Sequence, residues 1–117
     1  MILEHALLQI KPGQEAEFVR TFELASSIIA SIPGFIELTV SRGIESPGTF
    51  LLLVKWQTLE DHTIGFRQSP GYLEWKRLLH HFYEPFPVVE HFDPIIERGP
   101  QISPEQPLVG PTTGGYV

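Results

Sequence analysis

The chain has 117 residues, of which 42% are hydrophobic, with a net charge of −6 and no cysteine. This length predicts a single domain with a buried core, and the lack of cysteine excludes disulfides, thiolate nucleophiles and cysteine-based metal sites. The eight Lys and Arg residues are scattered, which argues against nucleic-acid or anionic-membrane partners. No apolar run approaches a membrane span and the N-terminus lacks a basic signal-peptide start, so we expect a cytoplasmic protein.

The N-terminal part of the chain predicts a strand, a helix and a second strand. Residues 2–10 are rich in apolar side chains and precede a Lys-Pro-Gly turn, which is typical of a strand with two alternating faces. Apolar residues then recur every three or four positions over residues 14–32, which predicts an amphipathic helix that ends at Pro33-Gly34. Residues 35–42 alternate in polarity and predict the second strand.

The next predicted strand carries an unusual apolar run. Residues 49–56 form a hairpin with the preceding strand, and the five residues from Phe50 to Val54 are all apolar. A strand with one solvated face should alternate, so this run predicts that both faces are covered. Because a single helical layer covers only one face of a small sheet, we expect a partner chain on the other.

The remaining elements complete a recognisable order. Thr58 and Asp61 have capping-box spacing and predict a helix that runs to about Gln68. Ser69-Pro70-Gly71 interrupts it, a second helix spans residues 72–82, and residues 88–92 form a last strand. This β-α-β-β-α-β order predicts an α+β, ferredoxin-like fold with a four-stranded antiparallel sheet. Two such sheets packed face to face would form a dimeric α/β barrel.

The C-terminal segment differs in composition from the rest. Residues 93–117 contain five prolines and four glycines and show no periodicity. We therefore divide the chain into a ferredoxin-like domain, residues 1–92, and a Pro/Gly-rich tail, residues 93–117. We expect the tail to pack on the partner subunit, so that truncation after Phe92 weakens dimerisation.

Two residues near the helix break are candidates for chemistry. His62 shares a helix face with Leu59 and Phe66, which places an imidazole among apolar groups. Such a histidine is either a packed core residue or a general base or hydrogen-bond donor in an apolar pocket. Arg67 either complements the helix dipole or stabilises an anionic substrate.

Aromatic residues around these two predict either core packing or the lining of a cavity. The candidates are Trp56, Phe66, Tyr72 and Trp75. We predict no metal site, because adjacent His80 and His81 diverge by about 100° on a helix and cannot easily share an ion. The spacing leaves open a mixed site of His5, His62 and His91.

Three runs, LLLVKW, EDHTIGFRQSPGYLEW and HHFYEPFPVVEHF, resemble the antibiotic biosynthesis monooxygenase superfamily of dimeric α/β-barrel proteins. The resemblance covers about residues 1–92. It implies a homodimer formed through the open sheet face and a reaction without metal or organic cofactor, in which O2 oxidises a small aromatic quinol or anthrone. His62 would then act as base or orienting donor and Arg67 as oxyanion stabiliser, with Trp56, Phe66, Tyr72 and Trp75 binding the substrate.

The alternative is a non-catalytic dimeric barrel that binds a small ligand or protects the cell under stress. A sugar mutarotase would require paired polar or acidic groups in the pocket, and the second helix is instead aromatic. An open pocket beside His62 and Arg67 would favour chemistry or binding. Side chains that fill this space, with His62 bonded to a backbone carbonyl, would favour a purely structural role.

Overall fold

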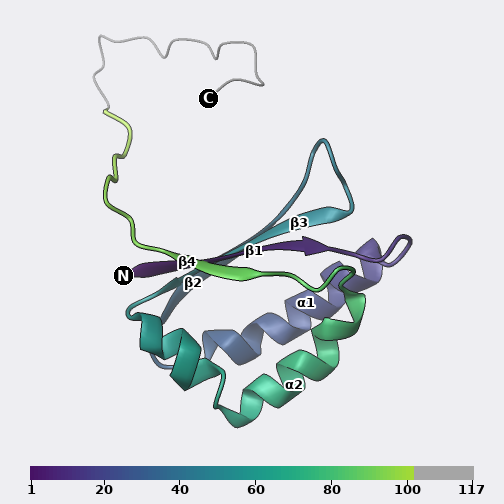
Figure 1. Ribbon diagram of the computed structural model, residues 1–117, viewed down its shortest axis with the longest axis horizontal. Coiled ribbons are helices and arrows are strands. Elements are labelled where there is room, and N and C mark those ends of the chain that lie inside the picture. The colour runs from purple at the N-terminus through teal and green to yellow at the C-terminus, as the bar shows by residue number, and fades with distance from the viewer. Residues whose placement is uncertain (102–117) are drawn as a thin grey trace.

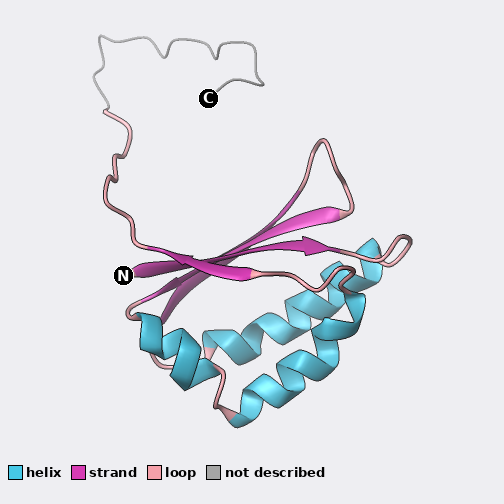
Figure 2. Cartoon of the chain, in the orientation of Figure 1, coloured by secondary structure: helices cyan, strands magenta, loops and turns pink. Residues whose placement is uncertain are grey.

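The computed structural model describes residues 1–101 and has the predicted α+β, ferredoxin-like architecture (Figure 1). The sheet is four-stranded and antiparallel in the order β2-β3-β1-β4, and all the helices lie on one of its faces (Figure 2). The sheet does not close on itself. The elements are β1 (Ile2–Gln9), α1 (Glu15–Ala30), β2 (Phe35–Arg42), β3 (Thr49–Trp56), a π-helix (Asp61–Phe66), α2 (Pro70–Leu79), a 3₁₀ turn (His80–Phe82) and β4 (Val89–Phe92).

Strand alternation divides the sheet into a covered and an open face. In β1 the even-numbered residues from Glu4 to Leu8 are buried beneath the helices, and in β3 every second residue from Phe50 to Trp56 is buried. Leu51 and Leu53 lie on the other face and are only partly buried, while Leu7 is 48% exposed. The apolar second face predicted from the sequence is therefore present and open; its coverage by a partner chain stays a prediction.

Helix α1 packs its predicted apolar stripe against the sheet. Its buried residues are Phe18, Phe22, Ala25 and Ile29. Phe22 meets Trp75 of α2 edge-on, with ring centroids 5.4 Å apart, so the two helices form one layer. Gly34 follows α1 with φ +90°, a conformation that side chains with a Cβ rarely adopt.

The predicted helix after Thr58 is shorter than expected and is a π-helix. The capping box is confirmed: the Thr58 N–H donates to Asp61 Oδ2 (3.0 Å) and the Asp61 N–H donates to Thr58 Oγ1 (3.2 Å). The Arg67 N–H donates to the His62 carbonyl (3.2 Å), an i to i+5 bond. The wider turn buries both His62 and Phe66 against the sheet.

Helix α2 begins with Pro70 in its first turn, as the sequence predicts. Trp75 and Leu79 are its buried residues. Its last predicted turn tightens into the 3₁₀ turn, which buries Phe82 and leads to Tyr83. A backbone bridge between Tyr83 and Ile10 then ties this end of the helix layer to the end of β1.

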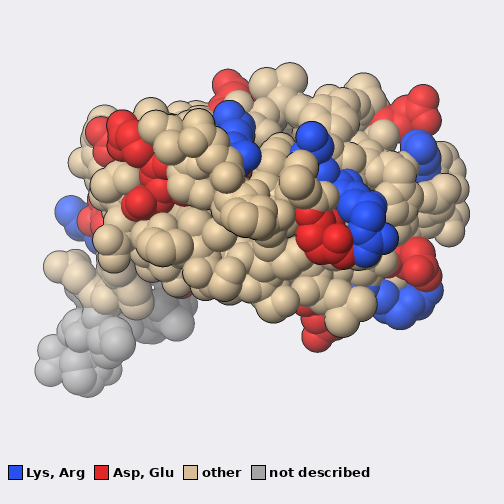
Figure 3. Space-filling model, turned by 90° about the horizontal axis from the view of Figure 1, so that it is seen from below, with Lys and Arg blue, Asp and Glu red and all other residues tan. Residues whose placement is uncertain are grey.

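Beyond β4, residues 93–101 form neither helix nor strand, and Ile95 and Ile96 are exposed. The rest of the predicted tail, residues 102–117, lies outside the described residues, so its packing on a partner is still a prediction. No helix within residues 1–101 has the length and apolar character needed to cross a membrane. Seen from the helical side, acidic and basic side chains are interspersed over the surface (Figure 3).

Candidate active site

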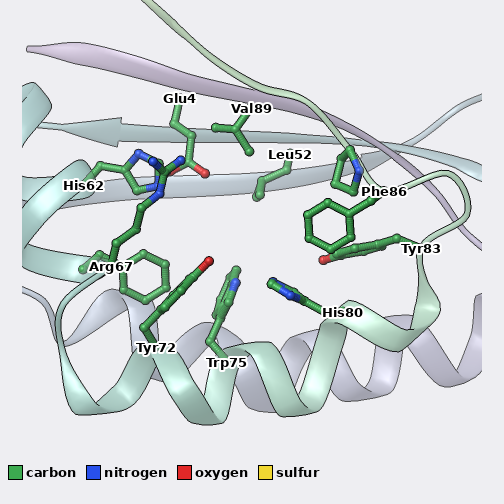
Figure 4. A pocket seen from close by; sticks show the side chains of 12 residues that line it. Glu4, Leu52, His62, Arg67, Tyr72, Trp75, His80, Tyr83, Phe86 and Val89 are labelled. Atoms are coloured by element: carbon green, nitrogen blue, oxygen red, sulfur yellow. The ribbon is translucent and has the colours of Figure 1, made fainter.

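A pocket of about 280 Å³ opens between the sheet and α2 (Figure 4). Its size lies near the lower limit for small-molecule sites, and its walls are mostly aromatic and aliphatic. It is lined by Glu4, Leu52, His62, Phe66, Arg67, Tyr72, Trp75, His80, Tyr83, Phe86, Pro87 and Val89.

Polar groups gather at two ends of this pocket. Glu4, His62 and Arg67 stand at one end, and His80 and Tyr83 stand at the other (Figure 4). The hydroxyl of Tyr83 points toward the middle, as does that of Tyr72 (Figure 4). Burial raises the pKa of Tyr83, with further contributions from Glu4 and Tyr72, so its hydroxyl stays protonated and can donate a hydrogen bond.

The sheet register places Glu4 beneath the helices. Glu4 lies on the covered face of β1, opposite Val54 of β3 on one side and His91 of β4 on the other. Trp56, two residues beyond Val54, is its diagonal neighbour. The Trp56 indole Nε1–H donates to Glu4 Oε1 at 2.9 Å, and His62 Nε2 lies 3.3 Å from the same oxygen.

His62 is held on three sides. Its ring stacks on Trp56, with centroids 5.5 Å apart and planes at 23°. Its Nδ1 is hydrogen-bonded to Nε2 of His91 at 2.7 Å, and its Nε2 faces Glu4 Oε1 at 3.3 Å. Burial lowers the pKa of His62 to about 3, with smaller contributions from Arg67 and His91, and the imidazole is therefore neutral near pH 7.

The electrostatics of Glu4 and Arg67 are linked. Burial raises the pKa of Glu4, while the Trp56 hydrogen bond and the Arg67 charge act in the opposite direction. Arg67 follows the π-helix, is exposed at the pocket rim and extends toward Glu4 and His62 (Figure 4). Within residues 1–101 no carboxylate forms an ion pair with Arg67, which leaves its guanidinium available to an anionic ligand.

Five of the six residues singled out from the sequence line one pocket: His62, Phe66, Arg67, Tyr72 and Trp75. The sixth, Trp56, does not line it. Trp56 is fully buried behind His62 and contacts Glu4 rather than the open space.

Sequence reasoning missed Glu4, His91, His80, Tyr83 and Phe86 as members or neighbours of the site. Glu4 carried a usable signal, because it is the one acid among apolar residues on the core-facing side of β1. The other four have no comparable pattern, and only the strand register and the path after α2 bring them near His62.

The mixed histidine site left open by the sequence does not form. His62 and His91 are adjacent, but His5 points to the open face of the sheet, where its ring meets Phe92. Within the described part of the chain no three His, Asp or Glu side chains are grouped to hold a metal ion.

The fold and this pocket define an α+β, ferredoxin-like protein with a ligand-sized site between its sheet and its helices. The family model for antibiotic biosynthesis monooxygenases matches residues 1–78. The chain belongs to that family.

Known proteins resemble this chain in sequence and in fold. The uncharacterised protein YczJ of Bacillus subtilis is 52% identical over 95 residues, which cover 81% of this chain and all of YczJ. A crystal structure of a candidate antibiotic biosynthesis monooxygenase from Bordetella bronchiseptica is 30% identical, with a TM-score of 0.77, and the match covers 81% of this chain and 97% of that one. SnoaB of Streptomyces nogalater, a cofactor-independent oxygenase whose structure is that of a point mutant, has a TM-score of 0.72 at 18% identity, covering 82% and 94% of the two chains, so its likeness concerns the fold.

Proposed function

We propose that this protein is a monooxygenase that uses O2 to oxidise a small aromatic quinol or anthrone, without a metal or organic cofactor. The observation that carries the proposal is an aromatic-walled pocket with a carboxyl, an imidazole and a guanidinium at one end. Membership of the monooxygenase family supports the reaction class, and the description of SnoaB as a cofactor-independent oxygenase supports the absence of a cofactor.

The pocket chemistry suits this reaction. The substrate first loses a proton, and the resulting anion transfers an electron to O2 to form a radical pair. Collapse of the pair gives a peroxide, which loses water to leave a quinone carbonyl. Arg67 would stabilise the oxyanion that forms at the rim, and His62 would serve as the base or as a donor that orients the reacting groups. The surrounding rings of Phe66, Tyr72 and Trp75 would hold the flat substrate and exclude water.

The same proposal includes a homodimer formed through the open face of the sheet. Leu51, Leu53 and Leu7 present apolar surface there without cover from the helices. His5 also lies on this face, and its Nδ1 is buried without a hydrogen-bond partner in residues 1–101. A second copy of the chain would cover this surface, as the apolar run in β3 predicts.

Filling the pocket tests whether it is the reaction site. Val89→Trp inserts an indole from the pocket wall, whereas Val88→Trp adds the same group at a neighbouring position that is 75% exposed and does not line the pocket. Oxygen uptake with 1,4-naphthohydroquinone and with anthrone should fall at least about tenfold in Val89→Trp and stay unchanged in Val88→Trp.

Equal rates in the two variants would place the reaction elsewhere. Saturable binding of both compounds by the wild-type protein, without oxygen uptake above the uncatalysed rate, would instead support the non-catalytic binding protein.

A further inference from the structure

We propose that Glu4 is the catalytic residue that accepts the substrate's proton, and that His62, held by His91, is a positioning residue for it. This inference rests on the proposed function of the pocket. It assigns the role of general base to Glu4, whereas the helix pattern in the sequence suggested His62 for that role.

The two oxygens of Glu4 have different surroundings. Oε1 is 2.9 Å from the Trp56 indole nitrogen and 3.3 Å from His62 Nε2. Oε2 accepts no hydrogen bond from residues 1–101. It is not fully buried either, since the only fully buried side-chain nitrogen or oxygen without a partner in this part of the chain is His5 Nδ1. Because Glu4 lines the pocket and its carboxyl points into it (Figure 4), Oε2 is the oxygen that a bound ligand can reach.

His62, by contrast, has both ring nitrogens close to other side chains: Nδ1 lies 2.7 Å from His91 Nε2, and Nε2 lies 3.3 Å from Glu4 Oε1. A neutral imidazole carries one N–H and one lone pair. One of the two imidazoles donates in the His62–His91 hydrogen bond, while His62 Nε2 and Glu4 Oε1 are neighbours at ion-pair distance without a hydrogen bond between them. Proton uptake at His62 would either displace the hydrogen bond to His91 or bring the substrate into the narrow space beside Glu4 Oε1, whereas Glu4 can take a proton at Oε2 with both neighbours in place.

The surroundings also make Glu4 an effective base. Burial raises the pKa of Glu4 toward the range in which a carboxylate accepts protons near neutral pH. The charged and titratable groups around it are Arg67 at the rim, His62 on the π-helix, His91 on β4, and Tyr72 and Tyr83 across the pocket.

The proton step is then simple to write. The O–H bond of a phenolic substrate breaks, its electron pair stays on the oxygen, and the proton binds Glu4 Oε2. The phenolate that remains lies at the end of the pocket where Arg67 stands, and a neutral Glu4 no longer repels it. For an anthrone the broken bond is the acidic C–H, and the charge spreads to the ring oxygen.

Three variants separate the two roles. Glu4→Gln keeps an oxygen that accepts from Trp56 but cannot take a proton, and Glu4→Asp keeps the acid on a shorter side chain. His62→Gln keeps a donor toward Glu4. Oxygen uptake with 1,4-naphthohydroquinone should fall about 100-fold or more in Glu4→Gln, recover partly in Glu4→Asp, and fall about tenfold in His62→Gln.

The pH profile of kcat/KM adds a readout that a structural role would not change. Its acidic limb should disappear in Glu4→Gln and persist, shifted, in His62→Gln. Glu90→Gln, an exposed acid on the opposite face of β4, should match the wild type. Wild-type rates with an intact acidic limb in Glu4→Gln, together with loss of the limb in His62→Gln, would overturn the proposal and make His62 the base.

A wild-type protein that oxidises neither test compound would refute the proposed function but would not test the role of Glu4. Binding of 4-nitrophenol tests the position of Glu4 independently of oxidation. The visible absorption of its anion reports how much of the bound probe is ionised. The negative charge of Glu4 should keep the bound probe protonated in the wild type, and Glu4→Gln should lower the pKa of the bound phenol by about one unit or more. An unchanged pKa of the bound probe in a folded Glu4→Gln protein would show that Glu4 does not face the ligand.

Discussion

At the scale of single residues, the site depends on two buried groups whose pKa values shift in opposite directions. Burial raises the pKa of Glu4 and lowers that of His62, because it disfavours the charged form of each. The Trp56 hydrogen bond and the Arg67 charge act against this effect at Glu4 and favour its carboxylate form.

Because the pKa of His62 is lowered in the folded protein, the free energy of unfolding should decrease as the pH falls. Between pH 6.5 and about 3 the unfolded chain binds a proton at this position that the folded chain does not, so stability falls as the pH falls. The slope from this one group is at most about 1.4 kcal/mol per pH unit. Glu4 acts in the opposite sense, since its raised pKa favours the folded state at low pH.

Urea unfolding from pH 7 to about pH 4 should therefore show a flatter pH dependence in His62→Gln than in the wild type. His81→Gln, which changes an exposed histidine, serves as the control and should follow the wild type. Parallel curves for all three proteins would mean that His62 titrates normally in the folded state.

Substitution of Arg67 should lower activity without lowering stability. Arg67→Gln removes the cation nearest the developing oxyanion, so oxygen uptake should fall about 100-fold. Because the side chain is exposed and has no ion-pair partner in residues 1–101, the free energy of unfolding should change by less than about 0.5 kcal/mol. Arg77→Gln, at an exposed arginine on α2 that pairs with Glu74, should leave oxygen uptake unchanged; equal losses in both variants would exclude a specific role for Arg67.

At the scale of elements, the π-helix positions His62 and Arg67 next to the sheet. It is fixed at its start by the Thr58–Asp61 capping box and by the chain at Gly34, whose carbonyl accepts the Gln57 N–H at 2.8 Å. A Cβ built on Gly34 would lie 2.1 Å from Asp61 Oδ2. Because Gly34 has no side chain, Asp61 can occupy this space and cap the π-helix. The cap in turn fixes the start of the helix that carries His62.

Gly34→Ala should consequently destabilise the protein by more than backbone strain alone. A positive φ costs an alanine about 1 kcal/mol, and displacement of the Asp61 cap adds about 1 kcal/mol. Gly13→Ala is the matched control, because Gly13 also has a positive φ (+85°) but has nothing within 4 Å of its built Cβ. Urea unfolding should show a loss about twice as large at Gly34 as at Gly13, and equal losses would remove Asp61 from the explanation.

At the scale of the whole molecule, the helices cover one face of the sheet and leave an apolar face open (Figure 1). Burying apolar surface contributes about 25 cal/mol per Å², which would stabilise the proposed dimer if a second copy covered this face. The pocket lies on the helical side, and the proposed dimer would therefore leave its lining intact.

Leu53→Glu places a charge in the centre of the open face and should convert the proposed dimer into a monomer in sedimentation experiments. Leu73→Glu, on the outer surface of α2 where Leu73 is 69% exposed, should not change the sedimentation coefficient. A wild-type protein that sediments as a monomer would contradict the dimer directly, and a dimeric Leu53→Glu would move the interface to another surface.

The sequence by itself determined the order of elements, the core-facing stripes and five residues of the pocket wall. Periodicity is local, so the positions of Phe18 and Phe22 on α1, and of Phe66, Tyr72 and Trp75 around the helix break, follow from spacing alone. The Thr58–Asp61 cap was equally readable, because both partners lie within one turn.

Only the tertiary structure decided which polar groups share the pocket wall. Glu4 and His91 are separated by most of the chain, and strand register alone sets them opposite each other on β1 and β4. The π-turn then places the two ring nitrogens of His62 beside these two residues, at 2.7 Å from His91 Nε2 and 3.3 Å from Glu4 Oε1. Helical spacing made His62 a candidate base or hydrogen-bond donor, but only the long-range pairing of strands brings the carboxyl of Glu4 into the same pocket wall.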